Sequence, residues 1–513
     1  CRDEDPLLAA VLNGDATALK AILQTPKRCL TTPDNEDWTI LHEAAYSGHA
    51  ECLNILLADT REVKINYRTL RGETPLLLAV ARNKVDRVQC LLEKGANPNS
   101  PNKEKETPLA TACEGGHVDM VRLLLRYGAE VNNTCIYGWT ALHQTVCRDD
   151  VEVLRDAARI SPANLNGITP LFLAAQGSQL DALRFLVESG ADINTAVSDG
   201  TTALCEACRS GHEKVVQLLL SQNADPNKPG RERLLPLHIV AQEGHYEYAE
   251  YKIVVSMLVP VTSRKLVGLS GISPLHLAAK HNNDDALEIL IAAGFDTNSL
   301  VSAERSCLYE DRRSTALYFA IANNNVEAAT MLLEAGADPN LDTFNPLLVA
   351  VRRGCTELVA PLAEHGANVN VRMPNFPTVF PVTVMICNSR LSLLQYLLDN
   401  GCDATSCFEC EQRGHIPPSQ SSCQDILKHS IGLNPSVCRW AGPIIDVLLD
   451  YVGNVQLCSR LTEHLDGYEH WVHIKDKATP PCPLMQLCRL RIFEQVGVHR
   501  VKDLPTLIRR GNV

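Results

Sequence analysis

A segment of about 33 residues recurs along this chain and limits its possible folds more than any other feature of the sequence. The stretch from Gly200 to Asn227, GTTALCEACRSGHEKVVQLLLSQNADPN, shows the parts of this segment clearly. Apolar residues three and four apart predict one short helix before Gly211 and a second, more apolar helix after it. Gly211 is the expected end of the first helix, because glycine accepts the left-handed conformation found there. Two helices this short bury their apolar faces only when further copies stack on each side.

Further copies are present at this interval. The position held by Ala203 is taken elsewhere by Ile40, Pro75, Pro108, Ala141, Pro170, Pro236, Pro274, Ala316, Pro346 and Val382. Copies open with a T-P-L-H-x-A pattern and close with G-A-D-x-N, as in TALHQT (140–145) and GADIN (190–194). A period of about 33 residues with this opening is typical of ankyrin repeats. Over residues 5–405 the chain therefore resembles the ankyrin-repeat family, which implies an all-α solenoid of about 11–12 repeats.

Some copies depart from the period. Residues 5–23 resemble a first half-repeat that would cap the stack. The copy that begins at Ala141 is four residues short, which predicts a truncated second helix or a bend. The copies at Pro236 and Pro274 are longer, and the second excess falls in residues 299–313. Insertions in repeat proteins map to loops on one face, often the binding face; the alternative is a tolerated surface loop.

Charge and cysteine usage restrict partners and compartment. A net charge of −12 argues against non-specific binding to nucleic acid or to an acidic membrane surface. No apolar run reaches the length of a membrane span and no leader pattern is visible, although the start at Cys1 indicates a missing native N-terminus. Six of the 20 cysteines are expected inside repeat helices at small apolar positions: Cys52, Cys90, Cys113, Cys205, Cys208 and Cys355. This usage suits a reducing compartment and predicts a cytoplasmic or nuclear protein.

Histidines and a cysteine pair are the residues that most suggest chemistry. Repeat geometry accounts for eight histidines, which should bond the backbone of neighbouring repeats: His42, His143, His238, His276, His49, His117, His212 and His245. Cys407 and Cys410, with His415 and Cys423, have partial zinc-ligand character, but the loose second pair favours free thiols. No G-x-G-x-x-G, Walker A or H-E-x-x-H motif is present. The sequence therefore predicts no catalytic residue, no metal, no cofactor and no enzymatic activity.

The C-terminal part predicts three further segments. Residues 406–436 are rich in Pro, Ser and Gln and are typical of a linker. Residues 437–478 carry apolar residues at helical spacing and predict a helical connector. Residues 480–513 begin with a proline cluster, which would fix the start of a helix. In that helix Leu484, Cys488 and Ile492 line one stripe.

The stretch PLMQLCRLRI (483–492), placed behind an ankyrin array, resembles the elongin-binding part of a SOCS box. The resemblance implies that Leu484 enters a pocket on Elongin C, with further elongin contacts at Leu487, Cys488 and Ile492. It also implies a segment that recruits cullin 5 and its RING partner. Here that segment is Leu504, Pro505 and Leu507, and its usual second proline is absent.

The whole chain resembles the ankyrin repeat and SOCS box family, and residues 308–325 and 439–461 are most similar to its filamin-targeting member. The resemblance implies the substrate receptor of an Elongin B/C–cullin 5 ubiquitin ligase, with filamin as its substrate. The alternative is a plain ankyrin scaffold at the cytoskeleton. Candidate substrate-binding residues are Trp38, Trp139, Arg312 and Arg313. Aromatic residues at this edge of a repeat make anchors for a partner, and packing at the edge of the core is the other interpretation of both tryptophans.

Overall fold

The computed structural model describes most of the repeat array and parts of the chain that follows it. The described residues are 6–24, 37–47, 49–58, 64–148, 152, 154–155, 166–244, 249–371, 387, 390–405, 438–452, 455, 457, 462, 465–467 and 471–478. Among them all regular secondary structure is helical, apart from one isolated β-bridge between Ala196 and Thr202. The chain divides into two compact units, residues 1–266 and 267–513, which we call unit 1 and unit 2.

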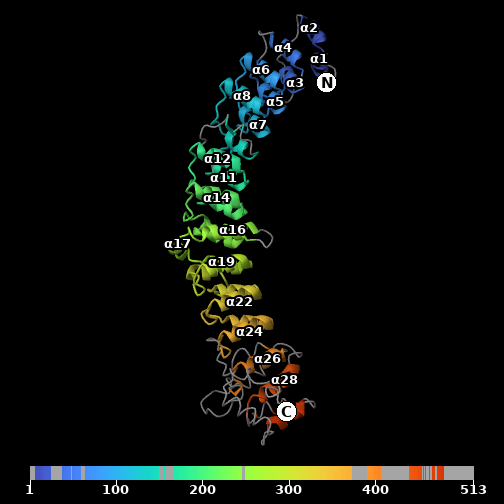
Figure 1. The fold of residues 1–513 in the computed structure, drawn as a ribbon. Coiled ribbons are helices and arrows are strands. Elements are labelled where there is room, and N and C mark those ends of the chain that lie inside the picture. Colours follow the sequence, from blue (N-terminus) through green and yellow to red (C-terminus); the bar gives the residue numbers. More distant parts are fainter. Residues whose placement is uncertain are drawn as a thin grey trace. The chain divides into compact units, whose positions relative to one another are not determined.

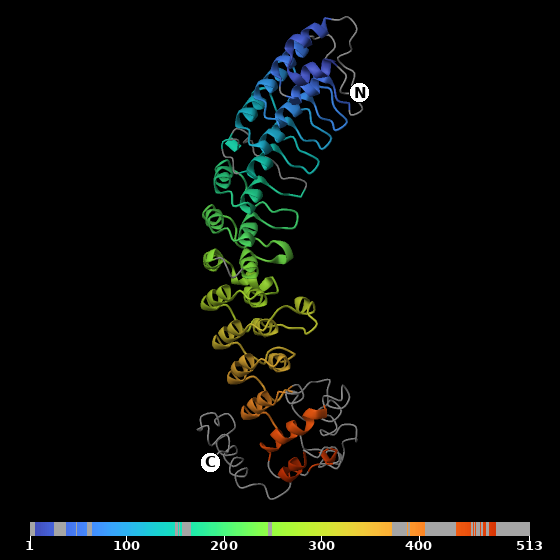
Figure 2. The ribbon, with the colours of Figure 1, turned by 90° about the vertical axis from the view of Figure 1, so that its right-hand side faces the viewer.

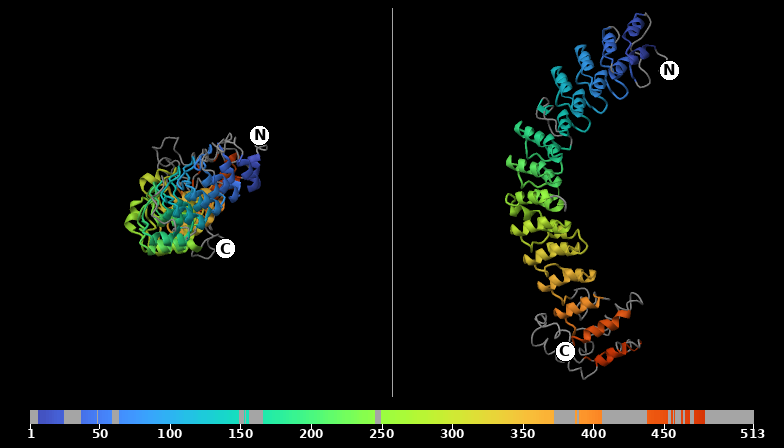
Figure 3. Two further views of the ribbon diagram at one scale, coloured as in Figure 1. Left: turned by 90° about the horizontal axis from the view of Figure 1, so that it is seen from above. Right: turned by 45° about the vertical axis from the view of Figure 1, so that its right-hand side comes forward.

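Unit 1 is a succession of helix pairs (Figure 1). Their first helices are α1 (Pro6–Asn13), α3 (Ile40–Ser47), α5 (Pro75–Ala81), α7 (Pro108–Gly115), α9 (Ala141–Val146), α11 (Pro170–Gln176), α13 (Ala203–Ser210) and α15 (Pro236–Glu243). The second helices are α2 (Ala16–Leu23), α4 (Ala50–Ala58), α6 (Val85–Glu93), α8 (Val118–Arg126), α12 (Leu180–Glu188), α14 (Glu213–Ser221) and α16 (Ala249–Leu258). A short 3-10 helix, η1 (Arg231–Arg233), precedes α15. First helices contact neighbouring first helices, and second helices contact neighbouring second helices (Figure 3). One buried apolar cluster extends from Leu7 to Ala141.

Unit 2 continues the same arrangement. Its helix pairs are α18 (Pro274–His281) with α19 (Asp284–Ala292), α21 (Ala316–Ala322) with α22 (Val326–Glu334), and α23 (Pro346–Arg353) with α24 (Thr356–Glu364). The remaining helices are α17 (Arg264–Leu269) at the boundary of the units, α20 (Ala303–Ser306), α26 (Leu391–Asp399), α28 (Cys438–Leu449) and α30 (Val472–Ala478). Helices α28 and α30 contact each other and bury a small cluster around Ile445 and Trp471.

The T-P-L opening works as a helix start. In α7 the Thr107 hydroxyl accepts a hydrogen bond from the Ala110 N–H (3.2 Å), and Pro108 occupies the first helical position. Threonine supplies an acceptor to an otherwise unpaired N–H, and proline has no N–H to leave unpaired. The helix ends at Gly116, whose φ of 68° is left-handed. Each repeat therefore fixes the length of its own first helix.

Asparagine side chains join one repeat to the next. The Asn340 amide donates to the Gly366 carbonyl (3.0 Å) and accepts from the Asn368 N–H (2.8 Å). The same amide-to-carbonyl bond to the following repeat is made by Asn99, Asn194, Asn227, Asn298 and Asn370. These asparagines close the G-A-D-x-N motif, so the motif both turns the chain and sets the stacking register.

The repeat prediction is confirmed, and three local expectations are corrected. Residues 6–23 form two helices, α1 and α2, rather than a half-repeat. Gly14, with φ 72°, separates α1 from α2, as Gly211 separates α13 from α14. Cys355 caps the start of α24 and does not lie inside a helix. The excess residues of the copy at Pro274 include a short helix, α20, rather than a plain loop. Val382, most of the second half of the short repeat and the predicted linker lie outside the described residues.

Candidate functional site

Hairpin turns project between successive repeats (Figure 2). We call three of those in unit 1 fingers: finger 69–73, finger 102–106 and finger 135–139. Each is closed by a backbone hydrogen bond from the first residue's N–H to the last residue's carbonyl, at 3.0, 3.0 and 2.9 Å. Backbone bonds of this kind hold a turn in one shape, so the side chains at the tips have fixed positions.

Adjacent fingers are bonded to each other. The Lys103 N–H donates to the Arg71 carbonyl (2.9 Å), and the Ile136 N–H donates to the Glu104 carbonyl (3.0 Å). Apolar side chains at the tips stay exposed: Leu70 at 50%, Ile136 at 42% and Tyr137 at 67% of their surface. Single exposed apolar residues are ordinary; here three of them lie on turns that are bonded to one another.

Both predicted tryptophans lie just before a first helix, Trp38 before α3 and Trp139 at the end of finger 135–139 before α9. The Trp38 ring lies 5.7 Å from His42 and its Nε1–H donates to Glu43 (3.1 Å). Trp139 lies 5.7 Å from His143 in the same tilted arrangement. Each indole is half-buried, so one side packs on the core histidine while part of the ring remains accessible. The geometry is compatible with both interpretations made from the sequence.

Trp38 belongs to a small aromatic group on α3. The Tyr46 ring meets Trp38 edge-on at 5.9 Å, and the Arg82 guanidinium lies 4.0 Å from the centre of the Tyr46 ring. Tyr46 and Arg82 are both exposed. A cation over an aromatic face holds the ring in place and keeps the positive charge available to a partner.

Arg312 and Arg313 lie in the insertion of unit 2 and differ in their surroundings. The Arg313 guanidinium forms two bonds to Asp311, at 2.6 and 2.8 Å, and lies 5.2–5.6 Å from the rings of Tyr309, Tyr318 and Phe319. Burial acts to raise the pKa of Asp311, but the hydrogen bonds and charge of Arg313 outweigh it and leave this pKa below its usual value. Arg313 therefore fastens the insertion, whereas the Arg312 side chain is exposed.

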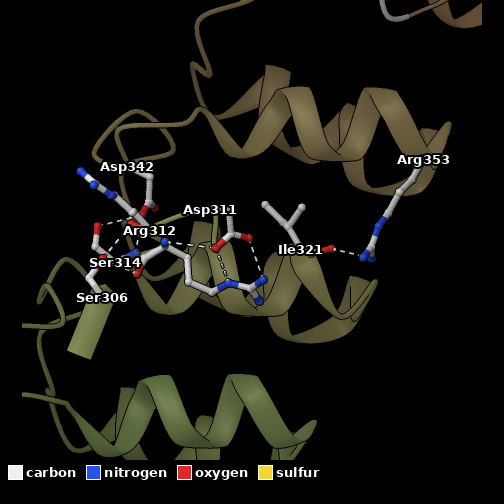
Figure 4. A network of polar contacts seen from close by, with 8 residues as sticks. Ser306, Asp311, Arg312, Ser314, Ile321, Asp342 and Arg353 are labelled. Atoms are coloured by element: carbon white, nitrogen blue, oxygen red, sulfur yellow. Dashed lines mark hydrogen bonds and ion pairs between the residues drawn. The ribbon is translucent and has the colours of Figure 1, made fainter. Parts of the chain in front are cut away.

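A second anchor of the insertion is Asp342 (Figure 4). Its carboxylate accepts from the N–H and hydroxyl of Ser314 (2.6 and 2.7 Å) and from the N–H of Thr315 (3.2 Å). Ser306 donates to the carbonyl of Arg312 (2.9 Å). The loop so held leaves Leu308 exposed over 79% of its surface. The excess residues thus form an ordered projection with an apolar side chain in solvent.

The histidines of the T-P-L-H slot have the structural role expected of them. In α9 the His143 Nδ1 accepts from the Thr140 N–H (3.2 Å), and its Nε2–H donates to the Ile168 carbonyl (3.0 Å) of the next repeat. Burial lowers the pKa of His143, and it lowers the pKa of His276 to about 4. Both rings are therefore neutral near pH 7 and serve as links between repeats.

The residues predicted to bind Elongin C and cullin 5 lie outside the described residues, namely Leu484, Leu487, Cys488, Ile492, Leu504, Pro505 and Leu507. The same holds for Cys407, Cys410, His415 and Cys423. Within the described part of the chain, no group of three His, Cys, Asp or Glu side chains could hold a metal ion.

Sequence reasoning missed Leu70, Ile136 and Tyr137, together with the Tyr46–Arg82 pair. The first three could have been found from the repeat period, because Leu70 and Ile136 both lie four residues before the opening threonine and Tyr137 follows Ile136. The pair could not, because Tyr46 and Arg82 meet only through the stacking of α3 on α5.

Comparisons with known proteins agree with this architecture. Models described as "Ankyrin repeats (3 copies)" match residues 7–102, 76–160, 149–230 and 299–373, and one described as "Ankyrin repeat" matches 270–300. The chain is thus an ankyrin-repeat protein. It is 50% identical over 516 residues to "Ankyrin repeat and SOCS box protein 2" of Rattus norvegicus, which covers 98% of this chain and 81% of that protein. The Homo sapiens protein of that name is 49% identical over 517 residues, with the same two shares. The chain belongs to the ankyrin repeat and SOCS box family.

A solved structure described as "Crystal structure of human ASB11 ankyrin repeat domain" also matches. It is 25% identical, covers 44% of this chain and 100% of its own, and has a TM-score of 0.38. No helix in the described part of the chain combines the length and apolar character that crossing a membrane requires.

Proposed function

We propose that this chain is the substrate-recognition subunit of an Elongin B/C–cullin 5 RING ubiquitin ligase. The observation that carries the proposal is the 50% identity to ankyrin repeat and SOCS box protein 2 over 98% of the chain, a span that reaches into the C-terminal segment. The name of that relative joins an ankyrin array to a SOCS box. In this proposal the array binds the substrate and residues 480–513 bind the ligase components.

The mechanism is proximity, with bond chemistry left to the other subunits. Elongin B and Elongin C bind the helix that begins near Leu484, and cullin 5 with its RING partner carries the ubiquitin-conjugating enzyme. Tethering raises the effective concentration of substrate lysines beside that enzyme. Exposed finger tips and aromatic groups such as Trp38 with Tyr46 support a protein substrate, because aromatic anchors dominate protein interfaces. Likeness to the filamin-targeting member makes filamin the first substrate to test.

Capture of purified Elongin B/C by the full chain tests the ligase assignment. We expect Leu484→Ser to abolish capture, since a leucine buried in a pocket contributes about 1.5–3 kcal/mol. Arg489→Ala, off the stripe of Leu484, Cys488 and Ile492, is the matched control and should capture normally. A full chain that captures no elongin would instead support the scaffold alternative.

Cullin 5 recruitment is a separate question, because the second proline of the usual segment is absent after Leu504 and Pro505. We expect the Elongin B/C-bound chain to capture cullin 5 more weakly than a SOCS box with both prolines. Restoring the proline-containing segment by substitution at Leu507 and its neighbours should strengthen capture. Equal capture before and after restoration would show that the second proline is dispensable.

A further inference from the structure

The three fingers of unit 1 form one continuous strip. Hydrogen bonds from Lys103 to Arg71 and from Ile136 to Glu104 tie finger 102–106 to the finger on each side. Leu70 therefore lies toward one end of the strip, the tip of finger 102–106 lies in the middle, and Ile136 with Tyr137 lies toward the other end. A partner that contacts one tip can reach the other two.

The strip carries excess positive charge on its first two fingers, on a chain whose net charge is −12. Arg71, Lys103 and Lys105 are exposed, against one exposed carboxylate, Glu104. The other two acidic residues of these fingers are half-buried and bonded within their own turns. Glu106 accepts from the Asn102 amide (2.8 Å), and Glu73 accepts from the Thr69 hydroxyl (3.5 Å).

Lys105 adopts a backbone conformation that glycine adopts more easily than lysine does. The fourth residue of a finger has positive φ, and in the fingers on either side it is glycine: Gly72 at 79° and Gly138 at 78°. Lys105 adopts the same conformation, with φ 60°. A left-handed conformation costs a residue with a side chain about 1–2 kcal/mol relative to glycine. Residues with backbone strain of this kind concentrate at functional sites. Binding of an anionic group of a partner by the Lys105 ammonium would account for the strain.

We propose that this strip, fingers 69–73, 102–106 and 135–139, binds an extended acidic segment of a partner protein that carries an apolar residue at each end. The inference rests on the proposed function and names the chemistry that a substrate would present. Carboxylates of the segment lie over Arg71, Lys103 and Lys105. Apolar side chains at its two ends contact Leu70 and the Ile136–Tyr137 pair.

Spacing and composition both favour a peptide. Helices stack at about 8–10 Å, so two steps along the array separate the end fingers by about 20 Å. An extended chain rises about 3.3 Å per residue and covers this distance in about six residues. A nucleic acid would also neutralise the lysines, but it would leave the aliphatic side chains of Leu70 and Ile136 without an apolar counterpart.

Fluorescence anisotropy with the full chain tests the proposal. The probe is a fluorescein-labelled peptide with a leucine and a phenylalanine about six positions apart and glutamates between them. Lys103→Glu with Lys105→Glu should weaken binding at least about tenfold, with the loss increasing at low salt. The matched control, Arg184→Glu with Lys214→Glu on the exposed faces of α12 and α14, changes the net charge equally and should bind as the unchanged chain does.

Two more variants separate charge from folding. Lys105→Gly keeps the left-handed turn and should still weaken binding about threefold or more. Tyr137→Ser should weaken binding without changing its salt dependence. The proposal is overturned if the unchanged chain binds no probe, if a glutamine version of the probe binds equally well, or if a single-stranded RNA of similar length binds in preference. The same variants should capture Elongin B/C normally. If the strip binds no acidic peptide but elongin is captured, the ligase assignment is unaffected. If elongin capture alone is lost, the proposal for the strip is unaffected.

Discussion

Arg87 occupies a core position where the next repeat has Met120. The side chain is 2% exposed, and its Nη1 donates to the carbonyl of Ala45 at the end of α3. Nη2 has no hydrogen-bond partner, and burial lowers the pKa of the guanidinium to about 10. A buried charge with an unpaired donor is costly, and the nearby charge of Asp86 offsets only part of its desolvation. Arg87 therefore links two repeats at a net cost in stability.

Arg87→Met should stabilise unit 1, because methionine of similar length already fits this position in the following repeat. We expect the free energy of unfolding to rise by about 1–2 kcal/mol, within the range seen when buried charges are replaced by apolar residues. Urea unfolding followed by circular dichroism measures this. Arg87→Ala is the control: it removes the charge but leaves a cavity, and should destabilise. If methionine lowers stability as alanine does, the link to Ala45 outweighs the cost of burial.

His276 makes the stability of unit 2 depend on pH. Burial lowers its folded-state pKa to about 4, below the unfolded value of about 6.5, so the unfolded chain binds more protons between these values. The stabilising contribution is complete above pH 6.5 and is lost as the pH falls toward 4. From pH 7 to pH 5 the expected loss is about 2 kcal/mol.

Replacing His276 with leucine tests this assignment, because Leu77 occupies the same slot in the second repeat. His276→Leu should lower stability at pH 7, since it removes the bonds to Ser273 and Ser314, yet its unfolding midpoint should change less between pH 7 and pH 5. An unchanged pH dependence would assign the effect to titrating groups of unit 2 other than His276.

At the scale of a single turn, glycine either allows a left-handed backbone conformation alone or also leaves room for a neighbouring backbone. Gly72 in finger 69–73 has φ 79°, and a Cβ there would come 2.8 Å from the Lys103 N–H nitrogen of the next finger. Gly95 has φ 88° but would meet nothing within 4 Å. Gly95→Ala should therefore cost only the backbone strain, about 1–2 kcal/mol. Gly72→Ala should cost more and also weaken the strip, measured as thermal stability and probe affinity. Equal losses from both substitutions would contradict the close approach of the fingers.

The helix pairs were predictable because each element carries its own start and stop signals within a few residues. Thr107 and Pro108 begin α7, and Gly116 ends it, without help from distant residues. The candidate site depends on contacts that cross between repeats, and a single repeat does not encode these. Arg313 is a candidate for partner binding because it lies in the insertion, but its stacking on Phe319 of α21 and its ion pair with Asp311 depend on the folded loop. The number of excess residues in 299–313 followed from the repeat period. The bonds that hold this insertion, to Asp342 and Asp311, could not be inferred from that number.

At the scale of the array, the strongest helix contacts among the described residues join neighbouring repeats. Helix α14 contacts α12 and α16 among the second helices, and α4 contacts α2 and α6. Stability of such an array is close to a sum of repeat and interface contributions. The local bonds described above act in the same way, since each asparagine or histidine reaches one repeat onward. Some repeats can therefore unfold, and lose their binding surface, while other repeats of the array remain folded.

Hydrogen exchange of two core variants tests this locality within unit 1. Leu219 in α14 and Leu53 in α4 are both fully buried, and truncation of either to alanine should cost about 2–5 kcal/mol. Leu219→Ala should raise exchange in α12, α14 and α16 while α4 stays protected, and Leu53→Ala should do the reverse. The acidic probe should lose affinity mainly with Leu53→Ala, because α4 lies closer along the array to the fingers. Equal exchange throughout unit 1 for both variants would mean that the array unfolds as one cooperative body, and then no substitution could separate partner binding from folding.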